Sequence, residues 1–173
     1  ATLAVDQMQL DLGGIAKGWA VDEAGRILKA NGIRRAFVAA SGDIRVTGPP
    51  LGRKGWRIEV RNVDEFGTLY PRTIHLKHQS LSTSGDTAQF VEINNRRWSH
   101  IVDPRTALGL THRLQVTVIA KTSTEADSQA TALSVLGLEK GKAFADSKHI
   151  RALFLNLKSE TPQITPSNHW RWQ

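Results

Sequence analysis

The chain has 173 residues, 40% of them hydrophobic and 23% charged, which is the composition of one folded domain rather than of a disordered chain. It contains no cysteine, which excludes disulfides, thiolate metal sites and a cysteine nucleophile. The formal net charge of +7 comes from lysines and arginines scattered without a dense block, so we expect a solvated surface and no nucleic-acid partner.

The first predicted helix covers residues 14–31. Its apolar residues recur at helical spacing, and Gly32 follows where a C-terminal cap is expected. The residues predicted to share one face are Ala16, Ala20, Ala24, Ile27 and Leu28.

Asp11, Gly13, Gly14 and Lys17 lie where an alternating apolar run, residues 8–12, meets this helix. Glycines allow close backbone approach, a helix N-terminus attracts anions and a lysine adds a positive charge. The segment is therefore suited to a phosphorylated ligand. The alternative is an ordinary turn, which carries the same glycines.

The middle of the chain has the pattern of short strands. Ser41–Asp43 forms a turn between the first two strands, and Asn94-Asn95 predicts a tight hairpin turn that leads to Trp98. The predicted strands, of which the first is expected to be buried, cover residues 35–40, 44–47, 56–60, 73–76, 90–93 and 114–120.

The second predicted helix covers residues 122–136 and begins with a capping box, Thr122 and Glu125. A short helix at 139–145 and a strand at 152–157 follow. The tail from Ser159 to the end is expected to pack on the surface or to be partly loose. The residues of the second helix that are predicted to face the core are Ala126, Ala130, Leu133 and Leu136.

Strands that arrive in hairpin pairs, with two principal helices, favour an α+β fold with a mainly antiparallel sheet and the helices packed on it. A doubly wound fold would need strands and helices to alternate, and here they do not. We expect residues 1–173 to form a single domain.

Asp127 and Thr131 lie four residues apart on one face of the second predicted helix. A carboxylate and a hydroxyl stacked in this way suit a hard cation such as Mg²⁺, which takes oxygen ligands and leaves positions for phosphate and water. The alternative is an exposed aspartate beside a threonine bonded to its own helix.

Residues 99–106 bring together a histidine, a carboxylate, an arginine and two hydroxyls. His100 could act as a general base near neutral pH, and Arg105 could hold a phosphate or Asp103. The alternative is a turn in which Asp103 caps the residues around Pro104. Ser82–Asp86 is a weaker signal: its hydroxyls and Asp86 could line a pocket, but a segment rich in serine and threonine is usually only a loop.

Five segments, in this order along the chain, resemble the ApbE family of FAD:protein FMN transferases, or flavin transferases. Two positions depart from the family pattern: Ala107 stands where the family usually has glycine after Asp-Pro-Arg-Thr, and Ser41 also replaces a usual glycine. The matching segments are Asp11–Asp22 (DLGGIAKGWAVD), Ser41–Arg45 (SGDIR), Ser84–Asp86 (SGD), His100–Thr106 (HIVDPRT) and Ala126–Leu133 (ADSQATAL).

The resemblance implies roles for individual residues. It places Asp11 and Lys17 in contact with FAD, and Ile101 against the flavin nucleotide. It makes His100 the candidate base that activates the attacking hydroxyl. The metal ligands that it implies for Mg²⁺ are the backbone carbonyl of Gly14 and the side chains of Asp127 and Thr131.

The resemblance further implies a Mg²⁺-dependent transfer of FMN from FAD to a threonine hydroxyl of a target flavoprotein, with release of AMP. Family members carry a substantial region before the segment that begins at Asp11, so the chain is expected to be the C-terminal part of such an enzyme. The expected location is the periplasm, or the outer side of the inner membrane. Two alternatives stay open: a Mg²⁺-dependent FAD pyrophosphatase that yields FMN and AMP, and a non-catalytic flavin-binding fragment.

Overall fold

The computed structural model describes residues 5–6, 10–63, 68–85, 89–158 and 161–172. Within them lie two helices, α1 (Ala16–Ala30) and α2 (Ser123–Ser147). No helix in this part of the chain is long and apolar enough to cross a membrane. Thr122 and Glu125 form the predicted capping box at the start of α2.

The main sheet has six strands, and every neighbouring pair is antiparallel. This confirms the predicted fold class. In spatial order the strands are β1 (Phe37–Ala40), β2 (Asp43–Val46), β5 (Gln79–Gly85), β10 (Leu114–Ala120), β11 (Arg151–Asn156) and β12 (Gln163–Pro166).

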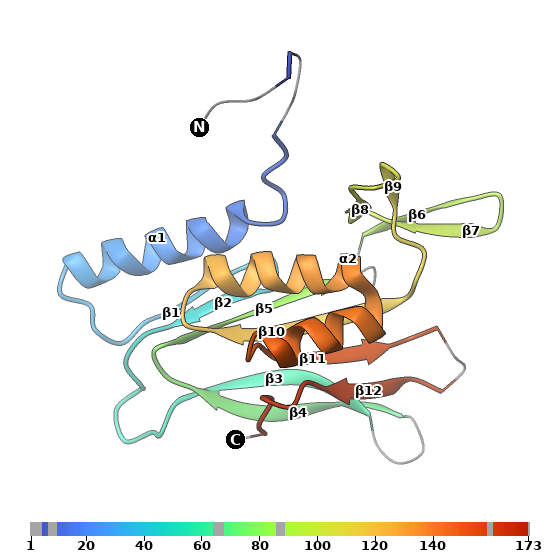
Figure 1. The fold of residues 1–173 in the computed structure, drawn as a ribbon. Helices are drawn as coiled ribbons and strands as arrows, with labels where there is room; N and C mark the ends of the chain where they lie inside the picture. Colours follow the sequence, from blue (N-terminus) through green and yellow to red (C-terminus); the bar gives the residue numbers. More distant parts are fainter. Residues whose placement is uncertain (1–4, 7–9, 64–67, 86–88, 159–160, 173) are drawn as a thin grey trace.

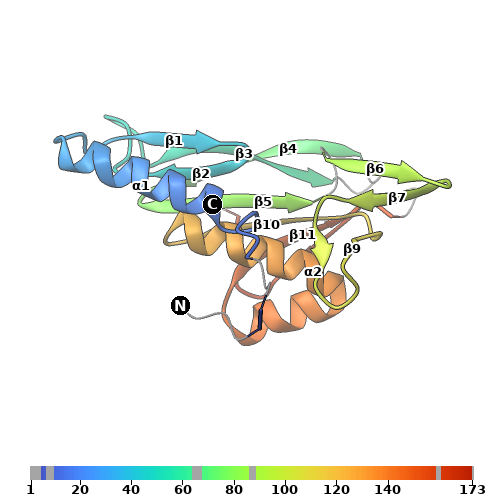
Figure 2. The same cartoon turned by 90° about the horizontal axis from the view of Figure 1, so that it is seen from above.

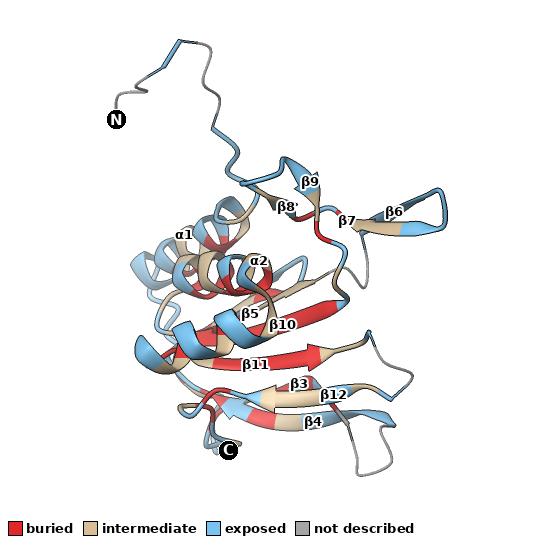
Figure 3. Ribbon diagram, turned by 45° about the vertical axis from the view of Figure 1, so that its right-hand side comes forward, coloured by how far each residue is buried: buried red, intermediate tan, exposed pale blue. Residues whose placement is uncertain are grey.

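The sheet is covered on both faces (Figure 1). On one face, α1 contacts β1 and β2 while α2 contacts β5, β10 and β11, as the view from above shows (Figure 2). On the other face lies a ribbon of β3 (Trp56–Val63) and β4 (Leu69–Leu76). Two apolar clusters result, one under α2 around Phe154 and one under the ribbon around Ile74, and the central strands are the most buried part of the fold (Figure 3).

Two small hairpins extend beside the end of the sheet near α2 (Figures 1 and 3). They are β6 (Phe90–Ile93) with β7 (Arg96–Ser99), and β8 (Val102–Asp103) with β9 (Leu108–Gly109). The predicted tight turn is confirmed, since Asn94 and Asn95 join β6 to β7 with φ values of 51° and 58°.

The segment predicted to be a serine-rich loop is instead β5, a central strand with buried Ser80 and Ser82. Ser82 is tolerated in the middle of the sheet because its hydroxyl donates to Asp43, and the hydroxyl of Ser84 likewise meets that of Thr131. Asp86, the last residue of that motif, lies outside the described residues, as do residues 8 and 9 of the alternating run before Asp11.

The buried side of α1 also differs from the predicted one. Gly18, Val21 and Gly25 are buried, whereas Ile27 of the predicted face is 49% exposed. Small residues let the helix backbone approach its neighbours closely, and an apolar pattern alone does not reveal that. On α2, Leu136 is likewise exposed, because the helix bends at Gly137, where φ is 76° and ψ is 178°. Beyond this bend the helix continues through the predicted short helix.

Both ends of the sheet depart from expectation. The first strand, predicted to be buried, is the edge strand β1, in which Phe37 is 42% exposed. The predicted surface tail adds β12 to the opposite edge, and Trp170 packs into the cluster under the ribbon with only 4% of its surface exposed. Apolar content predicts strands, but which strand is central depends on pairing.

Candidate functional site

The two helices meet where both begin, and Gly18 makes the contact close. A Cβ atom at residue 18 would lie 2.4 Å from the Ser123 carbonyl oxygen and 2.8 Å from the Cβ of Asp127. Because real Cβ atoms do not approach other atoms so closely, glycine is required for this crossing.

Each helix supplies an aspartate that satisfies N–H groups at the start of the other. Asp127 of α2 accepts a hydrogen bond from the Gly18 N–H (3.0 Å), and the N-cap residue of α1, Ile15, offers no side-chain cap. Asp22 of α1 accepts from the N–H groups of Ser123 and Thr124, both at 2.9 Å. Burial raises the pKa of Asp22, but these N–H groups and the Thr124 hydroxyl lower it more, so the pKa lies below its usual value.

Lys17 lies between two buried carboxylates. Its ammonium is 3.0 Å from Oδ1 of Asp127 and 3.5 Å from Oδ2 of Asp43, and it also reaches the Gly13 carbonyl at 3.4 Å. Asp127 is fully buried and Asp43 is 1% exposed, whereas the Lys17 side chain is 42% exposed. Burial lowers the pKa of Lys17. The hydrogen bond to Asp127 and the charge of Asp43 raise it by more, so the pKa lies above its usual value.

Asp43 begins β2 and faces the helices. Its Oδ1 accepts the hydroxyl of Ser82 on β5, while the buried Oδ2 has no hydrogen-bond partner of good length among the described residues. Burial raises the pKa of Asp43, and the neighbouring charge of Asp127 acts in the same direction. Two buried carboxylates therefore share one ammonium, so a further positive charge at this cluster would be electrostatically favourable.

Thr131 lies one turn along α2 from Asp127 and faces the same junction. Its hydroxyl is 3.0 Å from that of Ser84 on β5, and a Cβ atom at Gly14 would lie 3.0 Å from its Cγ2. The turn before α1 is closed by Asp11, whose Oδ1 accepts the Gly13 N–H at 2.7 Å. The structure thus brings Asp127 and Thr131 beside the segment of Asp11, Gly14 and Lys17, although more than a hundred residues of the chain lie between the two groups.

The oxygen atoms at this junction belong to carboxylates, hydroxyls and carbonyl groups, which is the set that Mg²⁺ prefers. Among the described residues no group of three or more histidine, cysteine and acidic side chains gathers as a metal site. An oxygen set that combines carboxylates with Thr131 and a backbone carbonyl suits a hard cation, and Oδ2 of Asp43, which has only the distant Lys17 ammonium as a partner, also favours one. The residues present therefore fit Mg²⁺.

His100 and Ile101 belong to the hairpin segment. His100 is exposed, and its Nδ1 is 3.0 Å from the carbonyl oxygen of Gln89. Ile101 is buried, with its N–H bonded to the Ser99 hydroxyl. Neither makes a described hydrogen bond to the residues around Lys17. The segment is tied to α2 by His112, whose Nε2 is 2.7 Å from the Ser134 carbonyl oxygen, one turn beyond Thr131.

Asp103 and Arg105 form a turn. The Asp103 carboxylate accepts the N–H of Arg105 at 2.9 Å and its guanidinium at 2.8 and 2.7 Å. These bonds lower the pKa of Asp103 to about 2. Arg105 thus holds Asp103, as one of the two predicted arrangements has it.

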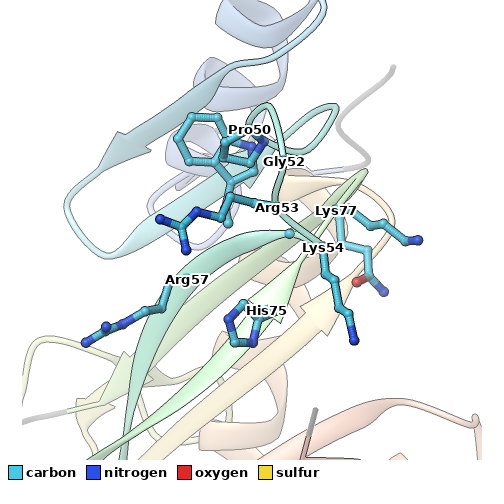
Figure 4. Close-up of a pocket in the computed structure, with 10 residues that line it drawn as sticks. Pro50, Gly52, Arg53, Lys54, Arg57, His75 and Lys77 are labelled. Carbon is cyan, nitrogen blue, oxygen red and sulfur yellow. The ribbon is translucent and has the colours of Figure 1, made fainter.

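A large cleft lies elsewhere and is lined by different groups. It has a volume of about 1110 Å³ and is lined by cationic side chains, among them Arg53 and Lys54 of the loop after β2 and Lys77 of the turn between β4 and β5. Figure 4 shows these side chains extending in different directions, and Arg57 pairs with Glu59 at 3.2 Å. The lining contains no carboxylate that could hold a cation, so the polar junction of α1, α2, β2 and β5 is the better candidate site.

Sequence patterns did not reveal Asp43, Asp22 and Ser84 as parts of this junction. The local pattern indicates a turn at Asp43, and at Ser84 it indicates a loop whose hydroxyls could line a pocket, without naming a partner for either residue. The one available signal was that all three residues lie within segments that resemble a family, because their partners are distant in the sequence.

The model of the ApbE family matches residues 2–154 of the chain. The FAD:protein FMN transferase of Vibrio cholerae is 35% identical over 154 residues, which cover 87% of this chain and 46% of that protein. The FAD:protein FMN transferase of Haemophilus influenzae is 31% identical over 167 residues, 95% of this chain and 48% of that protein.

Solved structures agree with these sequence matches. The apo form of the flavinyl transferase ApbE of Pseudomonas stutzeri superposes with a TM-score of 0.82 at 34% identity, covering 93% of this chain and 50% of that one. The flavin transferase ApbE of Vibrio cholerae gives 0.82 at 30% identity, covering 96% and 53%. The chain spans about half the length of the relatives that it matches.

Proposed function

The chain belongs to the ApbE family, and from this premise we propose that it carries the cation- and phosphate-binding part of an FAD:protein FMN transferase. The observation that carries the proposal is the cluster of Lys17, Asp127 and Asp43 at the junction of the two helices. Such a group of buried oxygens and one lysine suits a cation and a pyrophosphate held together.

In the proposed reaction, a threonine hydroxyl of an acceptor flavoprotein attacks the phosphorus on the FMN side of FAD. A new P–O bond forms to the acceptor, the bond to the AMP phosphate breaks, and AMP leaves. The hydroxyl proton goes to a base, for which His100 is the candidate. FMN stays on the acceptor as a phosphoester.

The residues of the cluster have separate tasks in this proposal. Asp127, Thr131 and the Gly14 carbonyl would hold Mg²⁺, which when bound offsets the charge that develops on the phosphates. Lys17 would contact the FAD pyrophosphate, Asp11 would shape the turn that approaches the nucleotide, and buried Ile101 would lie against the flavin nucleotide. An acceptor protein and a periplasmic location stay predictions.

Replacement of Asp127 is the direct test. We expect Asp127→Ala to lower Mg²⁺-dependent FMN transfer by about a hundredfold or more, because a bound metal contributes several kcal/mol to such reactions. The measurement is flavin fluorescence that stays on an acceptor flavoprotein after denaturing electrophoresis, with AMP quantified in parallel. Glu139→Ala, an exposed acidic residue on the same helix, is the matched control and should transfer normally.

Asp127→Asn should lose activity while keeping an oxygen that can accept the Gly18 N–H, which separates loss of the metal ligand from loss of the helix cap. Unchanged transfer in both Asp127 variants would contradict the assignment. Release of free FMN and AMP, with no flavin on the acceptor, would instead identify a pyrophosphatase. FAD binding without either product would identify a flavin-binding fragment.

A further inference from the structure

Asp43 has a position that the reaction described above does not use. It is buried at the start of β2, one of its oxygens has no hydrogen-bond partner of good length, and that oxygen faces the ammonium of Lys17 from 3.5 Å. A buried, poorly satisfied carboxylate oxygen is costly, so a fold that keeps one requires a reason.

The ammonium of Lys17 occupies the place where a cation would be expected. It contacts Asp127 Oδ1 at 3.0 Å and the Gly13 carbonyl at 3.4 Å, and the other oxygen of Asp127 is bonded to the Gly18 N–H. A divalent ion that binds Asp127 would therefore compete with Lys17 for the same oxygen, since an ammonium and a metal ion cannot share it at close range.

We infer that Asp43 is a positioning residue that receives the Lys17 ammonium when a divalent cation occupies Asp127. The Oδ2 atom of Asp43 is a buried acceptor that is short of a partner, and Lys17 can reach it by a small rotation of a flexible side chain. The presence of the cation in this inference rests on the proposed function. The movement of Lys17 toward Asp43 does not, because it can be tested without a metal.

With this movement, the Lys17 ammonium and the divalent ion both stay in the site. Without Asp43, a displaced Lys17 would turn to solvent, because its side chain is already partly exposed. With Asp43, the two carboxylates, the ammonium and a divalent ion together carry one net positive charge, which suits a pyrophosphate ligand. Ser82 orients the Asp43 carboxylate by donating its hydroxyl to Oδ1, which leaves Oδ2 toward Lys17.

The first experiment needs no metal. In Asp127→Asn, the amide oxygen can still accept the Gly18 N–H, and the amide nitrogen then faces Lys17 as a second donor. A crystal structure of this variant should show Lys17 Nζ moved to within about 3.0 Å of Asp43 Oδ2, the length of a charge-assisted hydrogen bond. A Lys17 side chain turned to solvent, with Oδ2 still lacking a partner, would overturn the inference.

The second experiment follows Lys17 in solution by competitive acylation and mass spectrometry, with and without Mg²⁺. In the unchanged chain Lys17 should stay protected at saturating Mg²⁺. In Asp43→Asn, Mg²⁺ should remove the protection, so that Lys17 reacts like the exposed Lys54. Asp146→Asn, which removes a carboxylate that pairs with Lys142 rather than with Lys17, is the matched control, in which protection should persist.

The outcomes separate the two proposals. Two results would contradict the role of Asp43. In the first, Mg²⁺ removes the protection of Lys17 from acylation in the unchanged chain. In the second, Lys17 stays protected in Asp43→Asn with Mg²⁺ bound. Absence of saturable Mg²⁺ binding, measured by calorimetry, contradicts the proposed metal site, and the Asp127→Asn structure then decides the role of Asp43 alone. Thermal unfolding of each variant verifies that it is folded.

Discussion

Individual aspartates join segments of this chain that are far apart in the sequence. Asp22 bonds to Ser123 and Thr124, Asp127 to Lys17 and Gly18, and Asp43 to Ser82. Each carboxylate has a charged or hydrogen-bonded partner, which is the condition under which a buried charge is tolerated. The same contacts that hold the two helices together therefore also build the candidate site.

Six described residues other than glycine have a positive φ, and two of them are the positions at which the chain has another residue where the family usually has glycine. Ala107 has a φ of 57° and Ser41 a φ of 47°. Because the left-handed region is unfavourable for residues with a Cβ atom, glycine would fit both turns with less strain.

We therefore predict that Ala107→Gly raises the free energy of unfolding by about 0.5–1 kcal/mol. Ala143→Gly, at an exposed position in α2, should have the opposite sign and lower it by about 1 kcal/mol. Chemical denaturation of both variants beside the unchanged chain measures the difference. A loss of stability in Ala107→Gly comparable to that in Ala143→Gly would refute the argument from φ.

At the level of elements, the crossing of α1 and α2 determines the geometry of the site. Gly18 and Gly25 lie on the buried side of α1, but they meet different neighbours. A Cβ atom at Gly18 would collide with the backbone of Ser123, whereas one at Gly25 would meet the Arg45 side chain at 3.0 Å. A backbone cannot yield locally, while a long side chain can rotate.

This contrast predicts unequal effects of the same substitution. Gly18→Ala should destabilise the chain by about 1–3 kcal/mol through overpacking, despite the better helix propensity of alanine. Gly25→Ala should be within about 1 kcal/mol of the unchanged chain, since the gain in propensity offsets a small shift of Arg45. Thermal unfolding compares them, and equal effects would show that the crossing is less tight than the distances indicate.

In the whole molecule, the six-stranded sheet separates two apolar cores and contributes residues to both. Helix α2 covers one face, and the ribbon of β3 and β4 covers the other together with the C-terminal segment. Trp170 closes the second core, although it lies three residues from the end of the sequence. The end of the chain is therefore a structural part of the fold.

Truncation of Trp170 tests this conclusion. We expect Trp170→Ala to lower the free energy of unfolding by about 3–5 kcal/mol, the usual cost of removing a buried tryptophan. Trp19→Ala removes the same atoms from a position that is 61% exposed and should change stability by no more than about 0.5 kcal/mol. Denaturant titration followed by circular dichroism measures both, and similar small losses would mean that the C-terminal segment contributes little.

The sequence by itself determined the features that depend on neighbours along the chain. The capping box at Thr122, the turn at Asn94-Asn95, the strand at 114–120 and the helical face of Asp127 and Thr131 follow from local spacing and local hydrogen bonds. The order of family-like segments also identified the family, because order and spacing together carry more information than any one motif.

The tertiary structure alone decided which strand is central, which face of α1 is buried and which carboxylates share Lys17. Ser82 and Ser84 look like loop residues until Asp43 and Thr131 lie opposite them. Asp43 looks like a turn residue until the sheet brings it to Lys17. The physical reason is that burial and electrostatic pairing depend on separation in space, and here the partners are as much as 110 residues apart.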